Sequence, residues 1–432
     1  MDLDIKQARI IINSLKSGVV PDADLEFFCS GRYNEIKEFN RCLELTKEGG
    51  SAVKFITGTY GSGKSFLLNI VGQKALKENF VIANIKIEKN FKFNKGEEMY
   101  YQIMHNLGIS NNHNKGTSFE EMFDIWVKEL QKNKDSALAD INNLISTIND
   151  YNSSFAIAFT SYIKAKINND ADLSNAASAW IKGEKNVSAS LKSKFNVKAS
   201  IDKTNYMSFF KAVIRLINLL GYSGLVILVD ELELIVGERS NIREAAYENI
   251  RNIIDMSGAG EINNCMFLFT GTNELFENEE KGIKTYSALY KRIVSSYDNE
   301  NLQFKDLRRS VIKIKGLGKE ELVQLTKNII SIHSMVYKWN PQIEDETITK
   351  YAEISCSRFG NKITESNTRE YSKKVVDALD IMEQNPGVDI FKNEVEVSGE
   401  LVVRSKTKEE TSTILDTIIE DSFFDNDIIK FD

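Results

Sequence analysis

The sequence predicts an α/β protein, with a parallel sheet interrupted by a long helical insertion and followed by a helical segment. Between residues 51 and 87 a strand, a glycine-rich turn, a helix and a second apolar strand follow one another. That order begins a parallel sheet. Two further apolar runs, 225–229 and 266–269, end in acidic or polar residues, as central parallel strands do.

Composition bounds the classes of protein that the chain can belong to. Its 432 residues are too many for one ordinary core, so more than one domain is expected. The net charge of -7 argues against a uniformly basic coat for nucleic acid, but it permits a local basic patch. Four cysteines without metal-like spacing predict free thiols. Without a secretion signal or an apolar run of about 20 residues, we expect a cytoplasmic protein with no membrane segment.

Hydrophobic periodicity predicts the elements in chain order. Two amphipathic helices are expected before SAVKFIT, the first strand. The expected helices are 5–17, 33–47, 65–77, 206–220, 241–256, 319–333, 344–357 and 368–385, and the expected strands are 51–57, 80–87, 225–229, 266–269 and 311–317.

Three stretches depart from the strand-and-helix alternation. From about 96 to 182, apolar residues recur every three or four positions, which predicts a helical insertion. Residues 183–204 are polar and predict an exposed loop or hairpin, and the residues from 409 predict an acidic tail. The expected domains are N-terminal helices at 1–50, the core at 51–317 with its insertion at about 96–205, a helical lid at 318–390 and the tail at 391–432.

The stretch GTYGSGKS, residues 58–65, fits the phosphate-binding pattern G-x-x-x-x-G-K-[ST]. Glycines let backbone N–H groups turn inward around a phosphate, and the next helix points its N-terminus at the anion. Lys64 can reach the β- and γ-phosphates of ATP, and the Ser65 hydroxyl can ligate Mg²⁺. The alternative is a glycine-rich turn before an ordinary helix. The residues expected to bind nucleotide here are Gly58, Thr59, Tyr60, Gly61, Ser62, Gly63, Lys64, Ser65 and Phe66.

The stretch VILVDE places Asp230 and Glu231 after a buried strand, at the sheet edge where α/β proteins bind ligands. Asp230 can hold Mg²⁺ through water, and Glu231 can orient and deprotonate an attacking water. Two acids at a strand end can also be a solvated turn. Together with the phosphate loop upstream, they predict an enzyme that hydrolyses ATP.

Polar residues after the next strand are candidates to assist catalysis. Among Thr270, Thr272 and Asn273, we expect Thr272 and Asn273 to bond the water or the γ-phosphate; the alternative is a helix cap. Arg292 can act in trans as an arginine finger, and Arg369 can reach the γ-phosphate from the helical lid. For both arginines the alternative is a surface charge.

The order of these motifs resembles an AAA+ ATPase of the Orc/Cdc6-like branch. More narrowly, it resembles the ATP-binding proteins of the BREX (bacteriophage exclusion) defence system, the BrxD family, over about residues 8–390. The stretches that carry the resemblance are IINSLKSGVVP at 11–21, GRYNEI at 31–36, GTYGSGKSFLL at 58–68, GYSGLVILVDELELI at 221–235, AYENIRNIID at 246–255, GTNELF at 271–276, YSALYKRI at 286–293 and TREYSKKVVDALDIMEQNP at 368–386.

This resemblance implies roles for individual residues. It implies Lys64 and Ser65 as ligands of ATP and Mg²⁺ (Walker A), Asp230 and Glu231 as the Walker B pair, Thr272 or Asn273 as sensor one, Arg292 as the finger, Arg369 as sensor two and Arg32 near the adenine. The family tends to have Thr-Pro-Glu after the sensor strand, where this chain has Thr272-Asn273-Glu274. It tends to have Thr-Pro-Arg-Glu before the last lid helix, where this chain has Asn367-Thr368-Arg369-Glu370. The register of the two sensors therefore stays open.

Proteins of this branch commonly grip DNA with loops, and one loop here has suitable residues. Lys86, Lys89, Lys92 and Lys95 are interleaved with Phe91 and Phe93, so cations can follow phosphates while aromatic rings insert or stack. The alternative is a solvated lysine face beside core phenylalanines.

We therefore expect a DNA-binding ATPase of a phage-defence complex that forms homo-oligomers and binds other defence proteins. The alternatives are a helicase loader or replication initiator on the same fold, and a signalling or scaffold switch with little ATP turnover.

Overall fold

The computed structural model describes residues 3–21, 24–110, 118–132, 134–195, 197, 200–293, 306–358 and 367–398. The chain forms two compact units, one of residues 32–315 and one of residues 1–31 with 316–432. The division falls at residues 31 and 316, whereas the expected domain boundaries are at 50 and 318. The expected acidic tail lies outside the described residues.

The larger unit is built around a six-stranded sheet in the order β3-β2-β4-β5-β1-β6. Every neighbouring pair is parallel except β2 with β3, which confirms the predicted parallel core. The strands are β1 Ser51–Thr57, β2 Val81–Lys86, β3 Leu107–Gly108, β4 Leu225–Asp230, β5 Cys265–Gly271 and β6 Val311–Lys313. The short antiparallel β3 is absent from the predicted elements, because two residues are too few to show a strand period.

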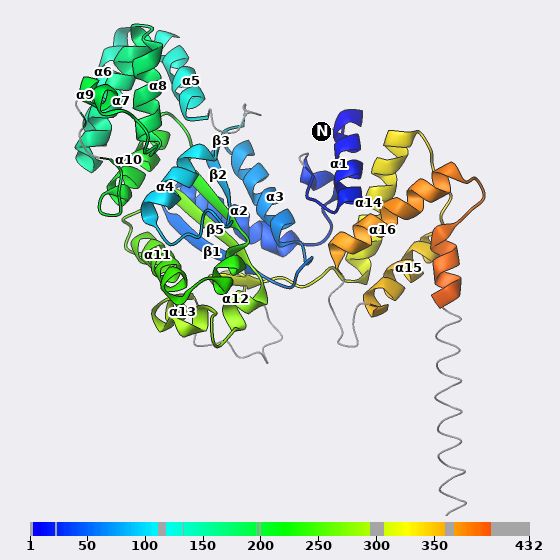
Figure 1. Ribbon diagram of the computed structural model, residues 1–432. Helices are drawn as coiled ribbons and strands as arrows, with labels where there is room; N and C mark the ends of the chain where they lie inside the picture. The colour runs from blue at the N-terminus through cyan, green and yellow to red at the C-terminus, as the bar shows by residue number, and fades with distance from the viewer. Residues whose placement is uncertain are drawn as a thin grey trace, which may run out of the picture. The chain divides into compact units, whose positions relative to one another are not determined.

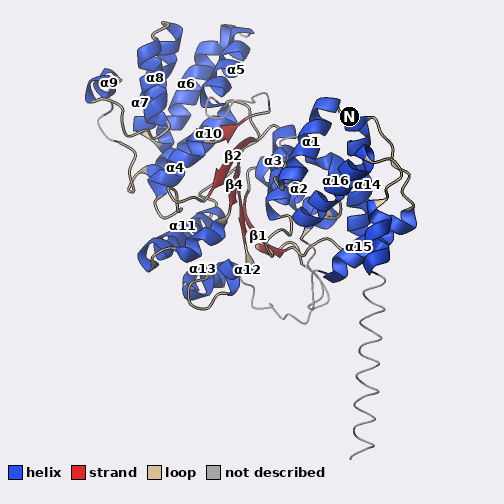
Figure 2. Ribbon diagram, turned by 45° about the vertical axis from the view of Figure 1, so that its right-hand side comes forward, coloured by secondary structure: helices blue, strands red, loops and turns tan. Residues whose placement is uncertain are grey.

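Helices cover both faces of this sheet (Figures 1 and 2). Within β4, Val226 and Leu228 are buried in one apolar cluster, and Ile227 and Val229 in the other. This alternation follows from the period of two along a strand. One face is covered by α2 Tyr33–Lys47 and α3 Lys64–Lys77, and the other by α4 Gly96–His105, α10 Tyr206–Leu219 and α11 Ser240–Gly258.

The predicted helical insertion is present between α4 and α10. Its helices are α5 Ser118–Lys132, α6 Lys134–Tyr151, α7 Ser153–Ile167, α8 Ala171–Ile181 and α9 Ala189–Lys194. The prediction of an exposed loop or hairpin at 183–204 is wrong in part, because α9 forms there and Phe195 is fully buried. Its ring packs edge-on against Trp180, 6.2 Å between centroids. One aromatic anchor thus orders a segment whose composition is polar.

Four short elements lie near the carboxyl ends of β4 and β5. They are η2 Leu232–Gly237, α12 Asn273–Glu277, η3 Ile283–Thr285 and α13 Ser287–Ile293. The expected strand at 311–317 is shorter than predicted, since β6 ends at Lys313.

The smaller unit is helical. It contains α1 Ile5–Ser17, η1 Leu25–Phe28, α14 Lys319–Tyr337, α15 Asp345–Arg358 and α16 Thr368–Gln384. Asp380 links three of these helices: its carboxylate lies 2.5 Å from the Lys16 ammonium and 3.1 Å from Nε2 of buried His333. Among the described residues, no helix of either unit is long and apolar enough to cross a membrane.

Candidate active site

The carboxyl ends of four parallel strands meet at one edge of the sheet. Thr57 at the end of β1 pairs in register with Gly271 of β5. Lys86 at the end of β2 pairs with Asp230 of β4. Because β5 lies between β1 and β4, the phosphate loop, the two acids and the polar residues after β5 belong to the same edge. This is the edge where open α/β sheets bind ligands.

Glycine is required at three positions of the loop between β1 and α3. A Cβ on Gly58 would lie 2.6 Å from the carbonyl oxygen of Ile314. Gly61 and Gly63 have φ angles of 81° and 94°, a left-handed conformation that side chains disfavour. Gly63 is the N-cap of α3, so the loop leads the backbone directly into a helix N-terminus.

The ammonium of Lys64 lies inside this loop. Its Nζ donates hydrogen bonds to the carbonyl oxygens of Gly58 and Thr59 at 3.0 and 2.9 Å, and the side chain is buried. The Ser62 hydroxyl also donates to Thr59, at 2.8 Å. The loop is therefore a compact cradle around a cation, in which backbone N–H groups and one ammonium can share an anion.

The remaining predicted loop residues lie around this cradle. Ser65 follows Lys64 in the first turn of α3 and is half-buried, as is Phe66. Tyr60, in contrast, is 70% exposed, so its ring is accessible to solvent on the surface of the loop.

The side chain of Arg32 contacts the backbone of the phosphate loop. The guanidinium donates to the carbonyl oxygen of Ser62 at 2.9 Å and to that of Lys315. Arg32 itself has a φ angle of 65° and precedes α2, and this left-handed turn is uncommon for a residue other than glycine. The structure thus brings Arg32 to the loop, while its expected position near the adenine stays a prediction.

Two donors fix the carboxylate of Asp230. The Thr270 hydroxyl donates to Oδ1 of Asp230, and the backbone N–H of Glu231 donates to the same oxygen at 3.0 Å. Thr270 is buried in the neighbouring strand β5. Thr270, one of the three candidates to bond the water or the γ-phosphate, therefore donates its hydroxyl to Asp230 at the end of β4.

Glu231 forms an ion pair with Lys86, a contact that the sequence does not predict. Glu231 has a φ angle of 61°, and its Oε1 lies 2.9 Å from Nζ of Lys86. The hydrogen bond to Glu231 raises the pKa of Lys86. Both side chains keep solvent contact, with 55% of Lys86 and 38% of Glu231 exposed. Glu231, the proposed base, can therefore exchange its contact with Lys86 for a contact with water.

Glu233 is a further acid at this edge that sequence reasoning missed. Burial raises its pKa, although the charge of Lys64 acts in the opposite direction. Its Oε2 is buried and has no hydrogen-bond partner among the described residues. That oxygen lies 3.7 Å from the position that a Cβ on Gly271 would take. The sequence feature that could have identified Glu233 is its place as the third acid of DELE, three residues after Asp230.

Asn273 lies next to the strand that leads into the phosphate loop. Its Oδ1 accepts a hydrogen bond from the Thr57 hydroxyl at 3.1 Å, and Thr57 is the last residue of β1. Thr272 is the N-cap of α12, without a side-chain cap bond. The structure thus brings Asn273 close to the loop, whereas the sensor roles of Thr272 and Asn273 stay predictions.

The two arginines expected to approach the γ-phosphate lie in different units. Arg292 of α13 forms a two-pronged ion pair with Asp255 of α11, with Nη2 of Arg292 at 2.9 Å from Oδ2 of Asp255. This bond raises the pKa of Arg292. Arg369 belongs to α16 of the smaller unit, where its methylene groups lie 3.5 Å from the position of a Cβ on Gly18. Their roles as finger and sensor two stay predictions.

The aromatic residues of the lysine loop belong to the core. Phe91 and Phe93 are 3% and 0% exposed, and the Phe93 ring packs edge-on against Phe269 of β5 at 5.6 Å. The expectation that these rings insert between or stack on bases is therefore wrong. A single sequence does not distinguish aromatic residues that face a core from those that face a ligand.

Three of the four lysines in that stretch are ion-paired, and Lys86 pairs with Glu231 as described above. Lys92 lies 2.7 Å from Glu238, and Lys95 lies 2.7 Å from Glu98. Lys89 is exposed. Contacts of these lysines with DNA stay a prediction.

The residues present fit a Mg²⁺ ion that is bound together with phosphate. A serine hydroxyl and a carboxylate, Ser65 and Asp230, are oxygen donors of the kind that Mg²⁺ takes beside substrate phosphates and water. Among the described residues, no group of three or more His, Cys, Asp or Glu side chains could hold a metal by itself. The buried and unpartnered oxygen of Glu233 shows that this edge has spare capacity to accept hydrogen bonds.

Comparison with known protein families gives a match over most of the chain. A family model described as BREX system ATP-binding protein BrxC/D matches residues 4–396. No curated protein matches the chain. Among solved structures, a closed state of Hsp104 with ATPγS and FITC casein is 12% identical, with a TM-score of 0.33. That match covers 84% of this chain but only 38% of the Hsp104 chain.

Proposed function

We propose that this chain, which belongs to the BREX system ATP-binding protein BrxC/D family, binds ATP with Mg²⁺ at the described sheet edge and hydrolyses it. One observation carries the proposal: a loop that encloses the Lys64 ammonium and a strand that ends in Asp230 and Glu231 belong to the same edge. The first arrangement suits a polyphosphate, and the second suits the water that attacks it.

In this proposal the chain's own groups divide the work. The loop amides, the N-terminus of α3 and Lys64 hold the β- and γ-phosphates. Ser65 and Asp230 hold Mg²⁺, which would neutralise charge on those phosphates. Glu231 accepts the proton of the attacking water, and it must first leave Lys86. Asn273, next to β1, is positioned to bond the water or the γ-phosphate.

The proposal extends to a second copy of the chain and to other proteins of the system. To serve as a finger on a second copy of the chain, Arg292 has to exchange Asp255 for phosphate. Membership of the family favours a role in a BREX system, which implies other proteins in the same system. Homo-oligomer formation and DNA binding stay predictions.

The test is ATP turnover measured beside ATP binding. We expect Glu231→Gln to bind ATP as tightly as the natural chain does, because a general base contributes to the rate and not to the affinity. Its rate of ATP turnover should be at least about 100-fold lower. Glu279→Gln, an exposed glutamate outside the site, is the control. Unchanged turnover in Glu231→Gln would show that Glu231 is not the base. Tight binding with negligible turnover in the natural chain would favour the alternative of a nucleotide-dependent switch.

The same assay tests Arg292. If the finger acts in trans, the rate per chain rises with protein concentration, and Arg292→Ala removes this rise.

A further inference from the structure

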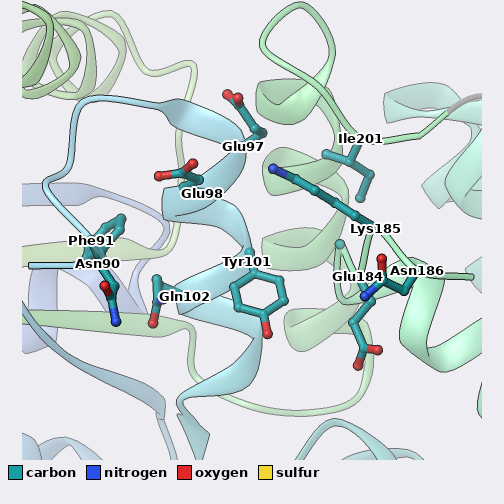
Figure 3. A pocket seen from close by; sticks show the side chains of 11 residues that line it. Asn90, Phe91, Glu97, Glu98, Tyr101, Gln102, Glu184, Lys185, Asn186 and Ile201 are labelled. Carbon is teal, nitrogen blue, oxygen red and sulfur yellow. The ribbon is translucent and has the colours of Figure 1, made fainter. Parts of the chain in front are cut away.

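A cavity of about 340 Å³ lies in the larger unit, away from the phosphate loop in the sequence. Its walls are the loop after β2, the exposed side of α4 and the segment between α8 and α9 (Figure 3). The side chains of α4 stand on one wall and those of residues 184–186 on another. Its volume lies at the lower end of the range for small-molecule sites.

The walls of the cavity are fixed to each other by contacts between α4 and the segment after α8. The Tyr100 hydroxyl donates to the carbonyl oxygen of Ile181 at 2.7 Å. Gly183 has a φ angle of 86°, and a Cβ there would lie 3.3 Å from the Tyr100 ring, so glycine allows the close approach. Nε2 of His105 lies 3.3 Å from the Glu184 carboxylate. These contacts make the cavity a preformed feature of the fold.

The lining favours a cation. It contains three carboxylates, Glu97, Glu98 and Glu184, and one ammonium, Lys185. Glu98 is paired with Lys95 and Glu184 with His105. Such a lining repels phosphate groups and attracts positive charge. The site therefore differs in chemistry from the phosphate cradle.

Two further observations point to a ligand rather than to a solvated acidic surface. Glu97 is half-buried, and its Oε2 atom has no hydrogen-bond partner among the described residues, so no bonded donor offsets the charge at that oxygen. Tyr101 is 37% exposed, and its ring is stacked on His105 with centroids 3.9 Å apart. A fixed and accessible aromatic ring beside carboxylates is a surface for cation–π contact.

We propose that this cavity binds an alkylammonium or guanidinium group, from either a basic side chain of a protein or a free polyamine. The carboxylates of Glu97 and Glu98 accept its N–H donors, and the ring of Tyr101 packs against its charge. The amides of Asn90, Gln102 and Asn186, which also line the cavity, supply further hydrogen-bond partners. This site is independent of nucleotide binding.

The experiment is saturation-transfer NMR on the full chain without nucleotide. The probes are Nα-acetyl-arginine methylamide, its neutral citrulline counterpart and spermidine. We expect the arginine compound or spermidine to bind with a dissociation constant of about 1 mM, and the citrulline compound to bind at least about tenfold more weakly. Preference for the arginine compound indicates a protein side chain, and preference for spermidine indicates a polyamine.

Variants identify the cavity as the binding site. Replacing both Glu97 and Glu98 by Gln, or Tyr101→Leu, should weaken binding of the cationic probe about tenfold. The double replacement of Glu279 and Glu280, an exposed pair outside the cavity, should not change it. Circular dichroism of each variant checks that it is folded. Equal binding of the neutral probe, absence of binding, or undiminished binding by both cavity variants would overturn the proposal.

Discussion

At the scale of single residues, the contact between Lys86 and Glu231 has the most direct consequence for rate. A carboxylate that forms an ion pair with an ammonium is less available to accept a proton from water. The pair is partly exposed on both sides, so its strength is at most about 1 kcal/mol. Breaking it is therefore possible during each catalytic cycle, and removing it should change the rate only a few-fold.

We expect Lys86→Met to raise basal ATP turnover by up to about fivefold, because 1 kcal/mol corresponds to a factor of about 5 in rate. The methionine keeps most of the length of the side chain but lacks its charge. Steady-state turnover at saturating ATP is the measurement. The control is Lys89→Met, which changes an exposed lysine in the loop that follows β2. A fall in turnover with Lys86→Met would mean that this lysine assists the reaction instead.

The sequence predicts some of these residues and not others. Lys64, Asp230 and Glu231 could be proposed as site residues because each belongs to a pattern of a few adjacent residues. The pairing of Lys86 with Glu231 depends on β2 lying beside β4, an order that the sequence alone does not reveal. The burial of Phe91 and Phe93 likewise depends on tertiary packing.

At the scale of elements, a buried ion pair connects β1 to its surroundings. Lys54 in β1 is 5% exposed, and its ammonium lies 2.9 Å from the carboxylate of Glu38 in α2. The same ammonium donates to the carbonyl oxygens of residues 307–309. Burial by itself raises the pKa of Glu38, but the bonds from Arg41 and Lys54 outweigh burial and lower the pKa to about 2. This network fixes the strand that carries the phosphate loop.

We expect Glu38→Gln to lower the free energy of unfolding by about 3 kcal/mol at pH 7, because it leaves the buried Lys54 charge without its carboxylate. The folded-state pKa of Glu38, about 2, lies below the ordinary 4.5. The carboxylate's stabilisation is therefore complete above pH 4.5 and is lost as the pH falls towards 2. Urea unfolding at pH 7, 5 and 3.5 should show the gap between natural and variant chains narrowing below pH 4.5.

Glu44→Gln, an exposed glutamate on the same helix, is the control for that series and should differ little from the natural chain. A gap for Glu38→Gln that stays constant, or widens, as the pH falls would contradict the role given to this carboxylate.

Elements could be predicted where their pattern is long and regular. The strands β4 and β5 are continuous apolar runs, and α1 and α2 have the expected bounds. The two-residue β3 and the short α9 have too few residues to show a period. Tertiary partners, Ile82 for β3 and Trp180 for the end of α9, decide those segments.

At the scale of the whole molecule, the sequence located the family but not the order of the strands or the division into units. Characteristic stretches near both ends of the chain indicate the same family that the matched model covers over residues 4–396. The helix α1 belongs to the same unit as residues 316–432, since it buries Ile11, Ile12 and Leu15 against helices of that unit. Contacts between segments so far apart in the chain leave no local pattern in the sequence.

Calorimetric titration of ATP with Mg²⁺ into the full chain tests the central claim most directly, beside Lys64→Ala and the control Lys77→Ala at the far end of α3. The account predicts uptake by the natural chain and by Lys77→Ala. It predicts affinity at least about tenfold weaker in Lys64→Ala, because an ammonium–phosphate bond is lost. Uptake that is unaltered by Lys64→Ala, or no uptake by the folded natural chain, would contradict it.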